Sequence, residues 1–122
     1  QAKYIILIFW DVDCSHCVTE IPKLLDIYHD LKKTIDVKVF SVYTVYEFEK
    51  WRKYIIDKKL DFINVYDPVH INNIKIKYDI FSTPKVYLLD KNKIIKSKHM
   101  PVEKIPEILK GYEEMEKTKS PK

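Results

Sequence analysis

Several features that would point to other classes of protein are missing from this sequence. No apolar segment approaches the roughly 20 residues that a membrane-spanning helix needs, so we expect no membrane span in this chain. No block of five or six like charges occurs, and the net charge is only +4, so nothing favours nucleic acid as a partner. Internal repeats and low-complexity tracts are absent as well, which excludes a repeat architecture.

Cysteine is scarce, and both cysteines of the chain, Cys14 and Cys17, lie in one four-residue motif. Two cysteines at this spacing can close a small disulfide ring when the first occupies a helix N-terminus, where unpaired N–H groups and the helix dipole favour a thiolate. From the residues alone the pair is a redox centre, a structural disulfide or half of a zinc site. A zinc site needs two more ligands, and the four histidines show no paired spacing, so we expect no metal.

The motif stands between two strongly patterned segments. Residues 3–10 form a continuous apolar, β-branched run, which is typical of a strand buried on both faces. After the motif, apolar residues recur at steps of three and four, which predicts a helix; they are Val18, Ile21, Leu24, Leu25, Tyr28 and Leu31. The cysteines are therefore expected in a strand-to-helix turn.

The middle of the chain continues the alternation of strand and helix. Residues 37–43 are rich in β-branched and aromatic side chains and predict a second strand. Thr44 and Glu47 have the spacing of a capping box, and a helix is expected from there to about Lys59. A short extended piece over 63–66 and a short helix near 71–78 follow.

The last third predicts a hairpin and a final helix. Strands over 84–89 and 94–98 are joined by a polar turn, which indicates antiparallel pairing. An amphipathic helix then carries Val102, Ile105, Leu109 and Tyr112, with Pro106 near its start. Parallel strands need crossover helices, so the fold class is α/β, with a central mixed sheet and helices on both faces.

The length fits a single domain, residues 1–122. The chain starts only two residues before a core strand, so we expect a domain excised from a longer protein. Residues from about 113 to 122 are expected to form a polar tail.

Residues around and beyond the motif carry a family resemblance. Trp10 stands four residues before Cys14, Pro22 stands five after Cys17, and Thr83-Pro84 precedes a strand. In these positions the chain resembles the thioredoxin superfamily. The CxxCxxExP pattern from Cys14 to Pro22 is similar to the TlpA/ResA branch of thiol-disulfide oxidoreductases, including domains at the C-terminal end of larger cell-envelope proteins. The resemblance implies a thioredoxin-like fold.

The resemblance also implies a function, which is thiol-disulfide exchange with protein substrates, in the reducing direction. Cys14 is the expected nucleophile because it lies nearest the helix N-terminus, and Cys17, one turn later, is the expected resolving thiol. Two alternatives remain open. One is a DsbA-like disulfide oxidase, and the other is a redox-silent thioredoxin-fold module that binds peptides.

Two neighbours of the cysteines are expected to tune the redox pair. His16 lies between them, where a donor or positive charge would favour the Cys14 thiolate; otherwise it is an exposed turn residue. Asp13 stands where thioredoxins commonly carry a tryptophan, and it either opposes the thiolate or caps the helix. The two effects have opposite signs, so the sequence does not predict the reduction potential.

Glu20 is the expected acid of the site. It follows Cys17 by three residues and so shares its side of the helix, and the resemblance implies proton exchange with that thiol. The alternative is an acid favoured by the helix dipole in the first turn. Ile8 occupies the strand position where thioredoxins keep a buried aspartate, so another acid must act, or none.

Substrate contacts are expected at Trp10, Thr83 and Pro84. By resemblance Pro84 is a cis-proline facing the disulfide, and the Thr83 backbone pairs with an extended substrate. The alternative is a trans proline that opens an edge strand. Trp10, together with Phe9 and Phe81, either lines an apolar groove or packs in the core.

The remaining expectations also follow from the resemblance. The Cys14–Cys17 disulfide is itself the redox group, so no cofactor is expected. Partners are protein thiols and disulfides and an upstream electron donor. The implied compartment is the periplasm or cell envelope, with a lipid anchor in the missing part as a further expectation.

Overall fold

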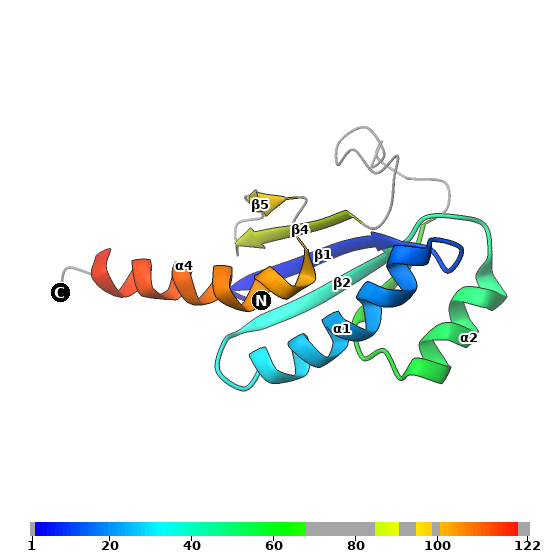
Figure 1. The fold of residues 1–122 in the computed structure, drawn as a ribbon, viewed down its shortest axis with the longest axis horizontal. Coiled ribbons are helices and arrows are strands. Elements are labelled where there is room, and N and C mark those ends of the chain that lie inside the picture. The colour runs from blue at the N-terminus through cyan, green and yellow to red at the C-terminus, as the bar shows by residue number, and fades with distance from the viewer. Residues whose placement is uncertain (1, 68–84, 91–94, 99–100, 120–122) are drawn as a thin grey trace.

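The computed structural model describes residues 2–67, 85–90, 95–98 and 101–119 (Figure 1). Along the chain its elements are β1 (Tyr4–Trp10), α1 (Ser15–Leu31), β2 (Val37–Tyr43), α2 (Phe48–Lys58), β3 (Ile63–Tyr66), β4 (Lys85–Asp90), β5 (Ile95–Lys98), the 3₁₀ turn η2 (Val102–Lys104) and α4 (Ile105–Lys119). The strands predicted over 3–10, 37–43, 63–66, 84–89 and 94–98 are confirmed to within a residue at each end.

The strands form one mixed sheet in the order β3-β2-β1-β4-β5. β1 pairs in parallel with β2, and β2 in parallel with β3. β4 runs antiparallel to both β1 and β5, as the predicted hairpin requires. The chain steps from β1 to β2 to β3 in one direction, and right-handed crossovers therefore place α1 and α2 on the same face of the sheet.

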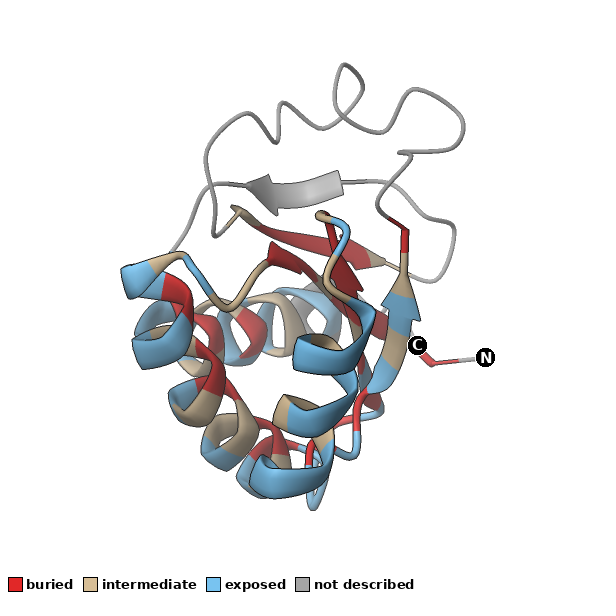
Figure 2. Ribbon diagram, turned by 90° about the vertical axis from the view of Figure 1, so that its right-hand side faces the viewer, coloured by how far each residue is buried: buried red, intermediate tan, exposed pale blue. Residues whose placement is uncertain are grey.

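The main core lies between that face and the helices. Ile6 and Ile8 of β1 have no exposed surface and share one cluster with Leu24 of α1 and Leu109 of α4. Figure 2 shows buried residues in the strands and on the inner sides of the helices, with exposed residues outside. All three helices of the described part contribute side chains to this cluster. The apolar surface buried in it stabilises their packing against the sheet.

A second, smaller cluster lies on the opposite face of the sheet. It contains Ile5, Phe9, Val42, Tyr87 and Leu89, all buried. The helix predicted near 71–78 lies outside the described residues. The fold is α/β with a mixed central sheet, as predicted, and a helix on the second face stays a prediction.

The predicted capping box at the start of α2 is wrong. The N-cap residue is Glu47, and the first helical residue is Phe48. Thr44 instead belongs to the sheet edge, where its backbone N–H and its hydroxyl both donate to the Trp10 carbonyl, at 3.2 and 3.4 Å. Thr44 is buried there, and its two hydrogen bonds connect the chain after β2 to the end of β1.

α4 continues to Lys119, into the segment predicted as a polar tail from about residue 113. The Tyr4 hydroxyl donates to Glu113 at 2.8 Å, and Lys3 forms ion pairs with Glu113 and Glu116. The tail lacks an apolar stripe of its own, and these contacts with the start of β1 supply the stabilisation that its sequence pattern does not reveal. Figure 1 shows the N-terminus beside α4.

Candidate active site

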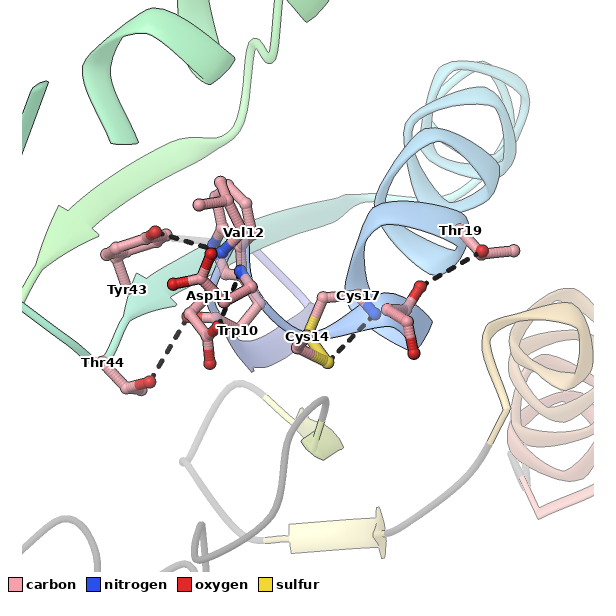
Figure 3. Close-up of a disulfide and its surroundings, with 10 residues drawn as sticks. Trp10, Asp11, Val12, Cys14, Cys17, Thr19, Tyr43 and Thr44 are labelled. Carbon is pink, nitrogen blue, oxygen red and sulfur yellow. Dashed lines mark hydrogen bonds between the residues drawn. A yellow bond between two sulfur atoms is a disulfide. The ribbon is translucent and has the colours of Figure 1, made fainter. Parts of the chain in front are cut away.

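The two cysteines lie where β1 gives way to α1, as predicted. Residues 11–13 form the turn between these elements, and Cys14 is the N-cap of α1, with an extended backbone (φ −87°, ψ 113°). The backbone N–H of Cys17 donates to the Cys14 sulfur at 3.1 Å (Figure 3). The sulfur thus takes the place of the oxygen that usually caps a helix, and it receives one of the unpaired N–H groups.

Cys14 and Cys17 form a disulfide, with their Cα atoms 5.2 Å apart. This separation lies in the usual range for disulfides. The two cysteines differ in burial, because Cys17 has no exposed surface whereas Cys14 is partly exposed. An incoming thiol or disulfide can therefore reach Cys14 but not Cys17.

The two expected tuning residues are both exposed. His16 lies on the first turn of α1 between the cysteines. Asp13 does not cap the helix, because Cys14 holds that position, so the capping alternative is wrong. The Asp13 carboxyl instead faces Glu47, which raises its pKa above the ordinary range, and it lies 3.7 Å from the ammonium group of Lys50.

Glu20 lies on the side of α1 that faces η2. Its carboxylate accepts the Val102 N–H at 3.5 Å and lies 3.6 Å from the Lys23 ammonium group. Lys23 also pairs with Glu103 at 2.9 Å, which lowers the pKa of Glu103. Glu20 therefore connects the helix that carries the cysteines with the segment before α4.

The structure places Trp10 in the core. It has no exposed surface, its indole N–H donates to the Ser41 hydroxyl at 3.2 Å, and its ring packs against Tyr43 and Tyr54. Phe9 is also buried, on the other face of the sheet. The packing alternative therefore describes both residues, since a side chain without exposed surface does not line a groove.

The other expected substrate contacts, Thr83 and Pro84, lie outside the described residues, as does Phe81. Their roles stay predictions. Ile8 is described, and it is fully buried in the main core, where its aliphatic side chain has no ionisable proton to exchange.

Sequence reasoning missed one member of the site, Tyr43. Its hydroxyl accepts the Val12 N–H at 3.0 Å (Figure 3) and donates to Glu47 at 2.8 Å. Burial raises the pKa of this hydroxyl well above its ordinary value. The sequence could have indicated Tyr43, because residues 3–10 and 37–43 are predicted as successive strands of one sheet. If such strands are parallel neighbours, their last residues lie close together at the carboxyl ends of the strands.

Among the described residues, no group of three or more histidine, cysteine, aspartate or glutamate side chains could hold a metal ion. Within the same ranges, no helix has the length and apolarity to cross a membrane.

The mixed sheet and the CxxC disulfide at the start of α1 define the class of this protein, a thioredoxin-fold thiol-disulfide oxidoreductase. The chain belongs to the AhpC/TSA family, whose sequence profile matches residues 1–98. A search of curated proteins finds no match.

Several solved structures are similar over most of the chain. A domain of a "possible thiol-disulfide isomerase" from Cytophaga hutchinsonii is 41% identical, has a TM-score of 0.86 and covers 98% of this chain and 81% of that one. The thioredoxin domain of a thiol-disulfide oxidoreductase from Bacteroides vulgatus is 25% identical, with a TM-score of 0.80 over 91% and 79% of the two chains. StoA from Bacillus subtilis is 26% identical, with a TM-score of 0.72 over 88% and 82%. The predicted thioredoxin-superfamily resemblance of the TlpA/ResA type is confirmed.

Proposed function

We propose that this protein reduces disulfides of protein substrates by dithiol exchange. The Cys14 thiolate attacks one sulfur of the substrate disulfide, and the other substrate sulfur leaves as a thiolate. Cys17 then attacks the Cys14 sulfur of the mixed disulfide, which releases the second substrate thiol and closes the Cys14–Cys17 disulfide. The substrate gains two electrons and the protein loses two.

The observation that carries this proposal is the unequal placement of the two cysteines. Cys14 is partly exposed at the N-terminus of a 17-residue helix, with the Cys17 N–H directed at its sulfur. The same arrangement favours a thiolate once the disulfide is reduced, because the helix dipole and the N–H group stabilise negative charge. Cys17 is buried, which suits a thiol that reacts only with its neighbour.

Glu20 is proposed to exchange a proton with Cys17, since the Cys17 thiol must lose a proton before it attacks the mixed disulfide. Glu20 follows on the same side of α1, and its side chain keeps a fifth of its surface exposed, so it can pass the proton to water. Ile8, which replaces the buried aspartate of thioredoxins, leaves the role open to Glu20.

The remaining parts of the proposal rest on the family resemblance. The disulfide is the redox group, so the reaction requires no cofactor, and a separate thiol donor reduces Cys14–Cys17 after each turnover. Thr83 and Pro84 are proposed to bind the substrate backbone beside the disulfide. The proposed compartment is the periplasm or cell envelope, where exported proteins carry disulfides.

A disulfide oxidase is the second candidate, and the exposed His16 between the cysteines favours it. A measured reduction potential separates the two directions. A value of about −270 mV, the thioredoxin end of the scale, supports a reductant. A value of about −120 mV supports an oxidase.

Insulin reduction by the purified chain tests the exchange reaction. Cys14→Ser is expected to abolish activity, and Cys17→Ser to trap a mixed disulfide that reducing agent releases.

Glu20→Gln is expected to slow closure of the Cys14–Cys17 disulfide, and Ser15→Ala, in the same turn, is the control that should retain activity. Activity that survives Cys14→Ser would contradict the mechanism, and an inactive intact protein would favour the peptide-binding module.

A further inference from the structure

A set of polar side chains from β2 and α2 holds the turn in front of Cys14. Tyr43, the last residue of β2, has no exposed surface, and its ring packs edge-on against Trp10 with the ring centres 4.9 Å apart. Its hydroxyl therefore has a fixed position, from which it accepts the Val12 N–H at 3.0 Å. Val12 lies two residues before Cys14, so Tyr43 restrains the backbone that leads to the nucleophile.

Glu47 extends this contact to α2. It is the N-cap residue of that helix, yet its side chain makes no capping bond. The carboxylate turns instead toward the cysteine turn, where it accepts the Tyr43 hydroxyl at 2.8 Å and lies 3.2 Å from the Lys50 ammonium group. The N-cap side chain of α2 thus contacts the end of β2 as well as Lys50 of its own helix.

The same carboxylate meets Asp13, the residue directly before Cys14. Lys50 lies 3.7 Å from Asp13 and is shared between the two acids. Their proximity raises the pKa of Asp13 and lowers that of Glu47. The charged and titratable groups that face Asp13 are Glu47, Lys50 and Asp11.

We propose that Tyr43 and Glu47 are positioning residues for the exchange reaction. Tyr43 holds the backbone of the turn, and Glu47, with Lys50 as its counter-ion, sets the charge beside Cys14 when the thiolate forms. The inference rests on the proposed function, because it takes Cys14 as the nucleophile.

The arrangement predicts opposite effects from its two kinds of charge. Carboxylates near Cys14 disfavour the thiolate, and the ammonium group of Lys50 favours it. Removal of the Glu47 charge should therefore increase the thiolate fraction at a given pH, and removal of the Lys50 charge should decrease it. Loosening of the turn would not produce shifts of opposite sign.

The experiment is the pH profile of Cys14 alkylation by iodoacetamide in the reduced full chain. Glu47→Gln keeps the size of the side chain and an oxygen that can still accept the Tyr43 hydroxyl. The midpoint of its alkylation profile should fall by roughly half a pH unit, which is about a threefold gain in thiolate below the midpoint. A shift of this size is expected for two charges that interact through solvent. The midpoint of Lys50→Met should rise by a similar amount.

Glu49→Gln is the matched control. It removes the same charge from the same helix, but Glu49 pairs with Arg52 and its side chain is 78% exposed. Its midpoint should stay at the wild-type value. The inference is overturned if Glu47→Gln leaves the midpoint unchanged, if Glu47→Gln and Lys50→Met shift it in the same direction, or if Glu49→Gln shifts it equally.

Wild-type insulin reduction, measured in parallel, tests the proposed function separately. An active wild type with an unmoved midpoint contradicts only the role of Glu47 and its counter-ion Lys50. An inactive wild type contradicts the exchange function, whatever the titration shows.

Discussion

Individual polar residues orient the aromatic side chains behind the cysteine turn. The fully buried Ser41 hydroxyl accepts the Trp10 indole N–H at 3.2 Å and donates to the Asn64 side-chain oxygen at 2.8 Å. The Asn64 amide in turn donates to the carbonyls of Leu60 and Phe62. This chain of bonds connects β1, β2 and β3 and leaves each of these buried groups with a partner.

Ser41→Ala should lower the free energy of unfolding by about 1–3 kcal/mol, because the buried Trp10 N–H loses its acceptor and Asn64 loses its donor. Urea denaturation of the oxidised protein at neutral pH measures this change. Thr34→Ala, at an exposed position after α1, is the control and should change stability by less than about 0.5 kcal/mol. Equal losses in the two variants would contradict the role of the buried bonds.

For single residues, the sequence predicts a role correctly where that role depends on residues close by in the chain. Cys14 and Cys17 could be placed in advance because a thiol pair and a helix start are local features. The sequence leaves two roles for Trp10, in a substrate groove or in the core. Only the packing of Tyr43 and Tyr54 against its ring shows that it belongs to the core.

Among the elements, the junction of β1 with α4 depends most on contacts between distant parts of the chain. Tyr4 stacks on Tyr112 with ring centres 6.3 Å apart, and its hydroxyl donates to Glu113. Burial first, and then this hydrogen bond, raises the pKa of Tyr4 to about 12. The same carboxylate pairs with Lys3, whose pKa is also raised.

This junction predicts a dependence of stability on alkaline pH. The folded state favours protonated Tyr4, so its contribution is complete below the ordinary tyrosine pKa of about 10. The contribution is then lost as the pH rises toward the folded value of about 12. Urea denaturation at a series of alkaline pH values should show a steeper fall in stability for the wild type than for Tyr4→Phe.

Lys3 loses its charge in the same range and adds to the fall in both proteins, since its raised pKa acts in the same direction. Tyr46→Phe, at an exposed tyrosine outside the junction, is the control and should follow the wild type. If Tyr4→Phe has the wild-type slope, Tyr4 does not titrate as the junction requires.

Element boundaries were predictable only where the pattern is local. The strand over 37–43 was located correctly from its β-branched and aromatic residues. The start of α2 was not, because Thr44 and Glu47 have the spacing of a cap but bond to β1 and β2 instead. A tertiary contact that uses the same side chain overrides the local motif.

Over the whole molecule, the disulfide connects the redox state to global stability. Cys17 is part of the main core and Cys14 packs against it, so closing or opening their bond acts on the domain rather than on a loose segment. For a two-electron pair, a difference of about 30 mV in reduction potential corresponds to about 1.4 kcal/mol in stability between the two forms.

The reductant proposal therefore predicts that the oxidised protein is more stable than the reduced one. A strong oxidant shows the reverse order, because its reduced form is the stabilised one. Urea denaturation of both forms, with Cys14→Ser as a chain that cannot close the disulfide, measures the difference. Greater stability of the reduced form would decide for the oxidase alternative.

The sequence by itself determined the order of strands and helices, the mixed sheet and the place of the cysteine pair. These follow from apolar spacing, turn residues and thiol chemistry, which act over a few residues and need no knowledge of what packs nearby. They predict an α/β fold with a cysteine pair in a strand-to-helix turn, and the family resemblance from Cys14 to Pro22 and at Thr83-Pro84 adds the thioredoxin-like class.

Only the tertiary structure decided which groups surround Cys14 and where α4 ends. The Glu47 carboxylate reaches Asp13 because β1 and β2 are neighbours in the sheet, not because of any spacing within α2. Tyr4 and Glu113, 109 positions apart, hold the last turns of α4 on β1. Contacts between residues so distant in sequence form only when the sheet and its helices have assembled, and they leave no periodic pattern from which to predict them.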